Sequence, residues 1–253
     1  MNHIWGNKLS QKSITTKSII HVDSLNSGYA NSHVLFGVDF EAKEKEITVV
    51  VGPNGSGKST LLKSIFGLCT VYSGKITYGG NTITGLAPHQ VARKKIAYLP
   101  QVNNVFSNLT IKENLSMASY TLDSKQISQR LPKIFEIFPV LKKYEKRKAD
   151  TLSGGERQML AMGMALIRQP KVMLFDEPTA SLSPKLADEV LSKIKQMRDE
   201  FGISIIMVEQ NVKRALNLAD FVYLLANGKQ VFKGKPEELL AHPELSKLYL
   251  GIT

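Results

Sequence analysis

Short apolar, β-branched runs alternate with stretches of helical periodicity along most of the chain. Runs of this kind predict strands at residues 47–51, 75–78, 96–99, 172–175, 203–208 and 221–225. Between residue 101 and about residue 166 the strand pattern is absent, and apolar residues such as Ile127, Leu131 and Ile134 recur at helical spacing. The alternation predicts an α/β core. The interruption predicts a helical subdomain inserted into that core at about residues 102–166.

Length and composition fit a single globular unit. The chain has 253 residues, of which 43% are hydrophobic and 22% charged, the balance of an ordinary folded domain. The longest apolar runs, at residues 203–208 and 221–226, fall far short of the roughly 18 residues that cross a bilayer, so the chain is not expected to be a membrane pore. Residues 1–20 are polar and basic and lack the apolar core of a secretion signal. We therefore predict a basic N-terminal extension at 1–20, one domain over 21–253, and a cytoplasmic location.

The formal net charge of +11 fits nucleic-acid binding, an anionic membrane surface, or neither. The basic residues are scattered apart from one cluster within residues 142–148, and no aromatic residues are interleaved with them at a spacing suited to base stacking. A solvated or membrane-facing helical surface is therefore favoured over a nucleic-acid groove.

A phosphate-binding loop follows the strand predicted at 47–51. The pattern G-x-x-x-x-G-K-[ST] is matched with a helix-forming stretch after it. Its glycines allow backbone N–H groups to converge on phosphate oxygens, and the following helix directs its positive end to the same charge. Lys58 is expected to reach the β- and γ-phosphates and to act in catalysis, and the Ser59 hydroxyl to bind Mg²⁺. The predicted ATP-binding residues of this loop are Gly52, Pro53, Asn54, Gly55, Ser56, Gly57, Lys58, Ser59 and Thr60.

Two carboxylates end the apolar strand predicted at 172–175. Asp176 and Glu177 follow it directly, as in a Walker B element. Asp176 is expected to position Mg²⁺, whereas Glu177, on the other side of the pleat, is expected to orient or deprotonate the attacking water. Capping of the turn before Pro178 is the alternative. Beside a phosphate loop, the catalytic role is favoured.

A third motif, Leu152-Ser153-Gly154-Gly155-Glu156, separates this chain from other P-loop proteins. Taken alone, it is better explained as a helix start capped by Ser153 and Glu156. The motifs occur in the order found in the ABC ATPase family, which the chain resembles from about residue 25 to its end. The resemblance implies a P-loop NTPase (RecA-like) core with a β subdomain and an inserted α-helical subdomain. It also implies that Ser153, Gly154 and Gly155 contact the γ-phosphate of ATP bound to the opposite subunit.

Further positions follow from the same resemblance. Tyr29 corresponds to the family's adenine-stacking aromatic residue, Gln101 to the glutamine beside the nucleotide and Mg²⁺, and residues 180–183 to the loop between paired subunits. Two positions depart from the pattern. Most members carry histidine where this chain has Gln210, and many carry aspartate where it has Ser183. Gln210 can bond the γ-phosphate or a water molecule through its amide, but it cannot become cationic near neutral pH.

Four segments resemble one of the two ATP-binding subunits of branched-chain amino acid importers, or of their urea and amide relatives. They are residues 158–162, 208–211, 218–220 and 249–251. This resemblance implies ATP hydrolysis coupled to amino-acid import at the cytoplasmic face of the membrane. The implied partners are two membrane-spanning permease subunits, a second ATP-binding subunit, and indirectly an external substrate-binding protein. A heterodimer of ATPases is favoured, with a homodimer as the alternative. The helical subdomain and residues 102–109 are expected to contact the permease.

Two other functions share these motifs. An exporter ATPase differs only in its membrane partner. An ABC protein acting on nucleic acid usually has two cassettes in one chain or a long coiled coil, whereas this chain has one phosphate loop and no sustained heptads. No nucleic-acid partner is therefore expected.

Overall fold

A six-stranded sheet forms the centre of the molecule, which we describe from a computed structural model covering residues 17–102, 104–242 and 244. Its strand order is β10-β9-β3-β8-β7-β6; β10 pairs antiparallel with β9, and the other pairs are parallel. The strands are β3 (Ile47–Val51), β6 (Ile96–Leu99), β7 (Val172–Asp176), β8 (Ser204–Val208), β9 (Phe221–Ala226) and β10 (Lys229–Gly234). Every residue of β3, β7 and β8 is buried. Burial on both faces explains their continuous apolar sequences.

A second, antiparallel sheet has the order β2-β1-β4-β5. Its strands are β1 (Ser18–Tyr29), β2 (Ser32–Lys43), β4 (Thr70–Tyr78) and β5 (Asn81–Thr82). Hydrogen bonds join it to the larger sheet: Glu41 N–H donates to the Tyr223 hydroxyl on β9 at 2.9 Å, and Phe36 N–H donates to the Gly228 carbonyl in the turn between β9 and β10 at 2.8 Å.

The boundary predicted for the N-terminal extension is corrected at its end. β1 begins at Ser18, and Ile20 is buried and pairs with both Ala42 and Tyr78. Apolar burial in the sheet therefore places residues 18–20 inside the domain. Residues 1–16 of the predicted extension, and the segment 249–251, lie outside the described residues.

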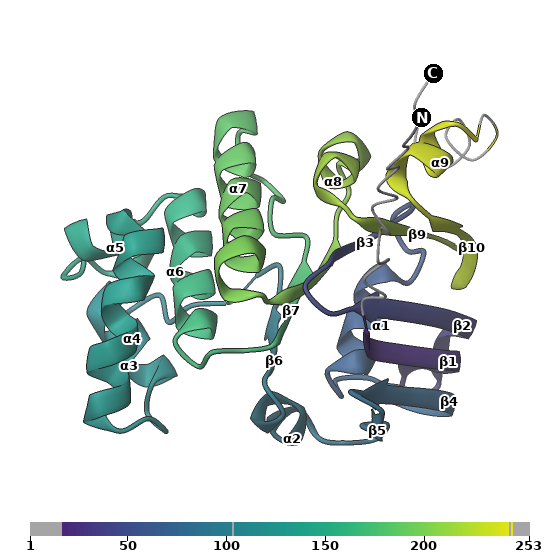
Figure 1. Ribbon diagram of the computed structural model, residues 1–253, viewed down its shortest axis with the longest axis horizontal. Coiled ribbons are helices and arrows are strands. Elements are labelled where there is room, and N and C mark those ends of the chain that lie inside the picture. The colour runs from purple at the N-terminus through teal and green to yellow at the C-terminus, as the bar shows by residue number, and fades with distance from the viewer. Residues whose placement is uncertain (1–16, 103, 243, 245–253) are drawn as a thin grey trace, which may run out of the picture.

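Helices cover the larger sheet and form a separate group on one side of it (Figure 1). They are α1 (Lys58–Ile65), α2 (Pro88–Arg93), α3 (Ile111–Ala118), α4 (Ser124–Ile137), α5 (Pro139–Lys143), the 3-10 turn η1 (Ala149–Thr151), α6 (Gly154–Leu166), α7 (Pro184–Phe201), α8 (Val212–Leu218) and α9 (Pro236–Leu240). The chain between β6 and β7 contains α3 to α6, which gather at one end of the molecule in Figure 1. Within the described parts of the chain, none of these helices is long and apolar enough to span a bilayer.

The larger sheet separates two apolar clusters. On β7, Met173 and Phe175 belong to the cluster shared with the helical group, whereas Val172 and Leu174 belong to the cluster that contains α1. This alternation follows from the period of two along a strand. The side chain of Asp176 continues the Val172 and Leu174 row. It therefore emerges on the α1 side of the sheet, where the phosphate loop lies.

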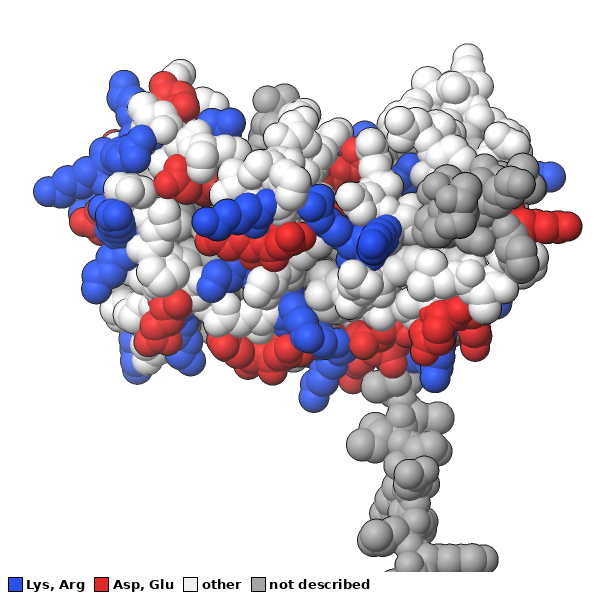
Figure 2. Space-filling view, turned by 90° about the horizontal axis from the view of Figure 1, so that it is seen from above, with Lys and Arg blue, Asp and Glu red and all other residues white. Residues whose placement is uncertain are grey.

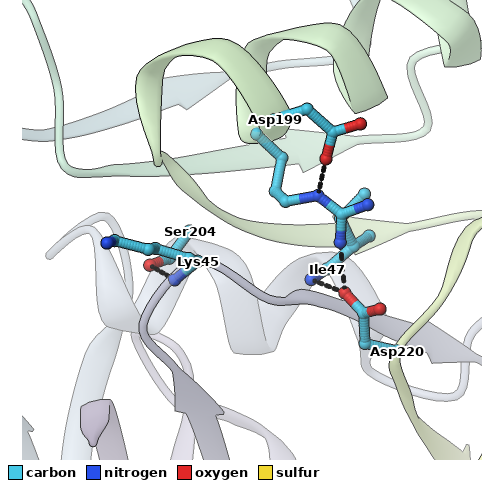
Figure 3. Close-up of polar contacts among 6 residues, drawn as sticks. Lys45, Ile47, Asp199, Ser204 and Asp220 are labelled. Atoms are coloured by element: carbon cyan, nitrogen blue, oxygen red, sulfur yellow. Dashed lines mark hydrogen bonds and ion pairs between the residues drawn. The ribbon is translucent and has the colours of Figure 1, made fainter. Parts of the chain in front are cut away.

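The amino-terminal ends of the parallel strands are held by a polar network (Figure 3). Oδ2 of Asp220 accepts hydrogen bonds from Ile47 N–H at 2.8 Å and from Arg198 at 2.7 Å, and Arg198 also pairs with Asp199. Nearby, the Ser204 hydroxyl accepts from Lys45 N–H at 2.9 Å. The network fixes the starts of β3, β8 and β9 against the end of α7. The strands whose carboxyl ends carry the phosphate loop and Gln210 are thus anchored at their other ends.

Candidate active site

The phosphate loop connects β3 to α1, and two of its glycines have neighbours that leave no room for a side chain. A Cβ atom on Gly52 (φ +143°) would lie 2.1 Å from the carbonyl oxygen of Leu225. On Gly57 (φ +98°) it would lie 2.5 Å from a methyl group of Leu35. Both positions therefore require glycine. α1 begins at Lys58, and its first turn contains no acidic residue. Its N-terminus is suited to an anion.

Two polar side chains of this loop, those of Ser56 and Lys58, are buried. The buried ammonium group of Lys58 donates to the carbonyl oxygens of Gly52 and Pro53, both at 2.9 Å. Burial lowers the pKa of Lys58, although Glu177 and Asp176 act in the opposite direction. The hydroxyl oxygen of Ser56 is buried without a hydrogen-bond partner among the described residues. A buried hydroxyl without a partner, beside a lysine at the start of a helix, fits a phosphate ligand.

Asp176 is fixed by two hydroxyl groups. Ser59 donates to Oδ1 at 2.7 Å, and Tyr98, from the neighbouring strand β6, donates to Oδ2 at 2.9 Å. Burial and the Asp176 carboxylate together raise the pKa of Tyr98 strongly, so its phenol remains a donor. A serine hydroxyl and a carboxylate oxygen in direct contact form a donor set that suits Mg²⁺. Tyr98 was not among the residues predicted from the sequence, because its contact with Asp176 depends on the pairing of β6 with β7.

Two predicted glutamines, Gln101 and Gln210, both contact the carboxylate of Glu177. Its Oε2 atom accepts from the Gln210 side-chain amide at 2.7 Å and from that of Gln101 at 3.0 Å. Glu177 is buried, and its φ of +50° is unusual for a residue other than glycine. Left-handed backbone in such residues is found at sites where surrounding contacts hold the chain. The geometry brings the acidic residue and the two glutamines, which come from three separate loops, to one oxygen atom.

The signature motif lies at the start of α6 and does not meet the phosphate loop. Ser153 is exposed and caps the helix, accepting from Glu156 N–H at 3.3 Å, while Glu156 accepts from Ser153 N–H at 2.7 Å. A Cβ atom on Gly154 would lie 2.7 Å from Leu182, so the helix start packs closely against the loop before α7. Figure 1 separates α6, in the helical group, from α1. The local capping role and the predicted exposure to a second subunit are both compatible with this geometry.

Tyr29 ends β1 on the side where α1 lies. Its side chain is 42% exposed, and the ammonium group of Lys63 on α1 is 5.8 Å from the centre of its ring. The ring thus keeps an open surface for a ligand. The tip of the phosphate loop, residues 53–55, is also exposed, whereas Thr60 is buried in α1.

Comparison with known proteins gives a consistent result. A family model described as ABC transporter matches residues 35–180. The chain is 53% identical over 228 residues to the probable branched-chain amino acid transport ATP-binding protein LivF of Archaeoglobus fulgidus, covering 90% of this chain and 97% of that protein. It is 40% identical over 233 residues to the high-affinity branched-chain amino acid transport ATP-binding protein BraG of Pseudomonas aeruginosa, covering 92% and 100%. The solved structure of MJ1267, an ATP-binding cassette of an ABC transporter in its ADP conformation, aligns with a TM-score of 0.84 and 26% identity over 94% of this chain and 100% of that one.

Fold and site together define a P-loop ATPase with an inserted helical subdomain. The chain belongs to the ABC transporter family. It is an ATP-binding subunit with ATPase activity, and membership of this family implies membrane association and membrane permease partners. The predicted fold class is confirmed, as is the predicted resemblance to the ATP-binding subunits of branched-chain amino acid importers.

Proposed function

We propose that this chain hydrolyses Mg·ATP at the cytoplasmic face of the membrane to drive import of branched-chain or other hydrophobic amino acids. Two observations support the proposal. Gln101 and Gln210 converge on one oxygen of Glu177 beside the phosphate loop, and relatives aligned over nearly the whole chain are named as branched-chain amino acid transport ATP-binding proteins. The first concerns the chemistry, and the second the transported substrate.

The phosphate loop would bind ATP through its backbone N–H groups, the Lys58 ammonium group and the Ser56 hydroxyl. ATP binding would exchange the two carbonyl contacts of Lys58 for contacts with the β- and γ-phosphates. The open face of the Tyr29 ring would stack on adenine. Ser59, Asp176 and Gln101 would hold Mg²⁺, which supplies charge neutralisation at the phosphates when bound. Tyr98 contributes by keeping the Asp176 carboxylate in one orientation.

Hydrolysis requires a water molecule in line with the γ-phosphorus. In the proposed reaction the water oxygen bonds to phosphorus, the bond from phosphorus to the ADP oxygen breaks, and Glu177 accepts the proton that the water loses. The amide groups of Gln101 and Gln210 would hold the Glu177 carboxylate and the water in register. Gln210 has no titrating group, so it acts by hydrogen bonding alone.

A second ATP-binding subunit is needed to complete the site. The exposed Ser153, with Gly154 and Gly155, would contact the γ-phosphate of ATP held by that subunit. Backbone N–H groups at the start of α6 suit an anion there. Closing of the pair over two ATP molecules would change the affinity of the assembly for its permease conformations. We propose a non-identical partner, with a homodimer as the alternative.

A groove of about 500 Å³ between the core and the helical subdomain is proposed as the permease docking site. It is lined by apolar side chains that include Leu99, Phe106, Met117, Leu122, Ala161 and Met164. The buried Asn114 amide bonds both the N–H and the carbonyl of Phe106, which fixes residues 104–109 beside the groove. Phe106 and Met117 are exposed apolar residues, which an amphipathic helix of a permease subunit would cover.

The basic cluster of the helical subdomain does not favour a nucleic-acid partner. Figure 2 shows many of the blue side chains gathered at the helical end of the molecule. The cations of Lys143 and Arg147 lie 5.0 Å and 4.7 Å from the centre of the Tyr144 ring, so the one aromatic ring within the cluster is already occupied. Base stacking needs an open aromatic face. The cluster is better suited to solvent or to an anionic membrane surface.

The test is to recover the tagged full-length chain from the membranes of its own host in mild detergent and to identify its companions. We expect two permease subunits, a second ATPase and amino-acid-dependent ATP turnover. The variant Glu177→Gln should retain Mg·ATP and lose turnover, because it removes the proton acceptor and leaves the phosphate loop intact. Unchanged turnover in Glu177→Gln would overturn the catalytic assignment. Recovery with exporter components, nucleic acid or ribosomes would overturn the import assignment alone.

A further inference from the structure

A buried carboxylate with no part in the chemistry above lies directly after β8. Glu209 is 2% exposed, and burial raises the pKa of its carboxyl group. Oε1 accepts from Thr179 N–H at 3.0 Å and from the Thr179 hydroxyl at 2.8 Å, and Oε2 accepts from Gln210 N–H at 3.2 Å. None of the ion pairs among the described residues involves Glu209. Because a buried carboxylate is costly unless its hydrogen bonds are made, the groups that it holds indicate its role.

Glu209 joins the two loops that carry the catalytic groups. β7 and β8 are adjacent parallel strands, with Asp176 opposite Val208. The loop after β7 carries Glu177 and then Thr179, and the loop after β8 carries Glu209 and then Gln210. The two loops therefore meet through two side-chain contacts, from Gln210 to Glu177 and from Thr179 to Glu209. The second contact is the more deeply buried of the two.

The loop after β7 has a backbone that needs such an anchor. Glu177 and Ser181 adopt left-handed φ angles of +50° and +62°. Thr179 lies midway between them, and a single oxygen of Glu209 fixes both its backbone N–H and its side chain. Conformations of this kind persist where surrounding contacts over-determine them. Loss of the Thr179 contact would let the loop relax and shift the Glu177 carboxylate.

We propose that Glu209 is a positioning residue for hydrolysis, which holds Thr179 and thereby keeps Glu177 in contact with Gln210. The inference rests on the proposed function, because it requires that Glu177 and Gln210 act on the attacking water. Glu209 makes no contact with the phosphate loop among the hydrogen bonds of the described residues. Its effect on the reaction is therefore indirect, through Thr179.

Three variants isolate the contact. Thr179→Val keeps the shape of the side chain and replaces the hydroxyl by a methyl group. Thr179→Ser keeps the hydroxyl and serves as the conservative rescue. Glu209→Gln removes the charge and sets an NH₂ group where Gln210 N–H now donates. Thr84→Val is the matched control, because the Thr84 hydroxyl accepts from Ile76 N–H at 2.7 Å in the other sheet.

The measurements are kcat, the KM for ATP and the ATP dissociation constant, made on each full-length chain with the subunits recovered from its host's membranes. Thr179→Val and Glu209→Gln should lower kcat at least about tenfold, because small displacements of reacting groups are costly in rate. KM and ATP affinity should stay within about twofold, since the phosphate loop is untouched. Thr179→Ser should retain most of kcat. The double variant Thr179→Val/Glu209→Gln should be no slower than the slower single variant, because both substitutions remove the same contact.

A purely structural role for Glu209 would give a different pattern. It would lower thermal stability without the split between kcat and KM, as expected for Thr84→Val. Wild-type kcat in Thr179→Val, an equal loss in Thr179→Ser, or multiplying losses in the double variant would each overturn the inference. The variant Glu177→Gln distinguishes failure of the proposed function from failure of the role proposed for Glu209. If it hydrolyses ATP normally, the proposed function fails; if it is inactive while Thr179→Val is normal, only the role of Glu209 fails.

Discussion

The hydroxyl group of Tyr98 donates to Oδ2 of Asp176 at 2.9 Å, across the paired strands β6 and β7. Ser59 bonds the other carboxylate oxygen, so the plane of the carboxylate is set from both sides. A phenol whose pKa is raised by burial and by this same carboxylate does not lose its proton at physiological pH. Tyr98 therefore stays a hydrogen-bond donor to Asp176 at physiological pH.

Replacing Tyr98 by phenylalanine should weaken the site for Mg²⁺ while preserving the packing of the ring against Phe66. We expect the Mg²⁺ concentration for half-maximal ATP turnover to rise by about tenfold, the size typical of lost groups behind a metal ligand. The measurement is turnover against Mg²⁺ at fixed ATP, with Tyr78→Phe as the control in the other sheet. An unchanged Mg²⁺ requirement would show that Ser59 alone suffices to orient Asp176.

Gln210 and Lys58 should differ in how much turnover depends on them. Gln210→Ala removes one amide donor, which a water molecule can partly replace, so a loss of about tenfold in kcat is expected. Lys58→Ala removes a buried cation from the phosphate loop and should lower both ATP affinity and kcat by a larger factor. Steady-state kinetics and ATP binding on the two variants decide the order. A larger loss in Gln210→Ala would mean that the amide has a role that water does not fill.

Cys69 provides a pH-dependent measurement close to Tyr29. Burial raises the pKa of its thiol, while hydrogen bonds from Tyr29 and Ser64 and the charge of Lys63 lower it by less. The thiolate is the reactive form, so a raised pKa means less thiolate at any given pH. Alkylation by iodoacetamide should therefore reach half its maximal rate at a higher pH than that of glutathione. Cys69 is the sole cysteine, so mass spectrometry reports it directly.

The same labelling has an internal control. Tyr29→Phe removes a hydrogen bond that lowers the pKa of the Cys69 thiol, and should move the half-maximal pH further upward. A half-maximal pH at or below that of glutathione would contradict the burial of the thiol.

The proposed permease groove can be tested by a charge placed in it. Met117 on α3 is 49% exposed and lines the groove, and Leu240 on α9 is 48% exposed at the other end of the molecule (Figure 1). Met117→Glu should greatly reduce recovery of permease subunits with the tagged chain, because a carboxylate would replace an apolar contact. Leu240→Glu should leave recovery unchanged. Both variants should bind ATP normally, and equal recovery of the permease in both would place the docking surface elsewhere.

Local sequence patterns predicted the parts of the fold that form from contiguous apolar runs. The predicted bounds of β3 and β6 agree with the structure because their residues are packed on one or both faces of a parallel sheet. β1 and β2 were missed. Many of their residues are exposed, and bulges near Leu25 and Ser27 interrupt the alternation that would reveal a strand.

In the site, too, residues that lie within one segment were predicted from the sequence, whereas contacts between distant segments were not. The phosphate loop, the acidic pair and the signature are each a single segment, so each could be identified from its own residues. The contacts of Asp176 with Tyr98, 78 residues away, and of Thr179 with Glu209, 30 residues away, depend on which strands are neighbours. Strand order in the central sheet is set by the packing of the whole domain, so no local pattern encodes these pairs.

The exposed Ser153, which forms its hydrogen bonds within its own helix start, has a genetic consequence. On the proposed pairing, a Lys58→Ala chain would still present an intact signature and an intact permease groove. It would occupy a place in the assembly and inactivate the nucleotide site that it forms there. In a cell that makes both forms, the defective chain would compete for the same partners, and uptake would fall with the share of assemblies that contain it.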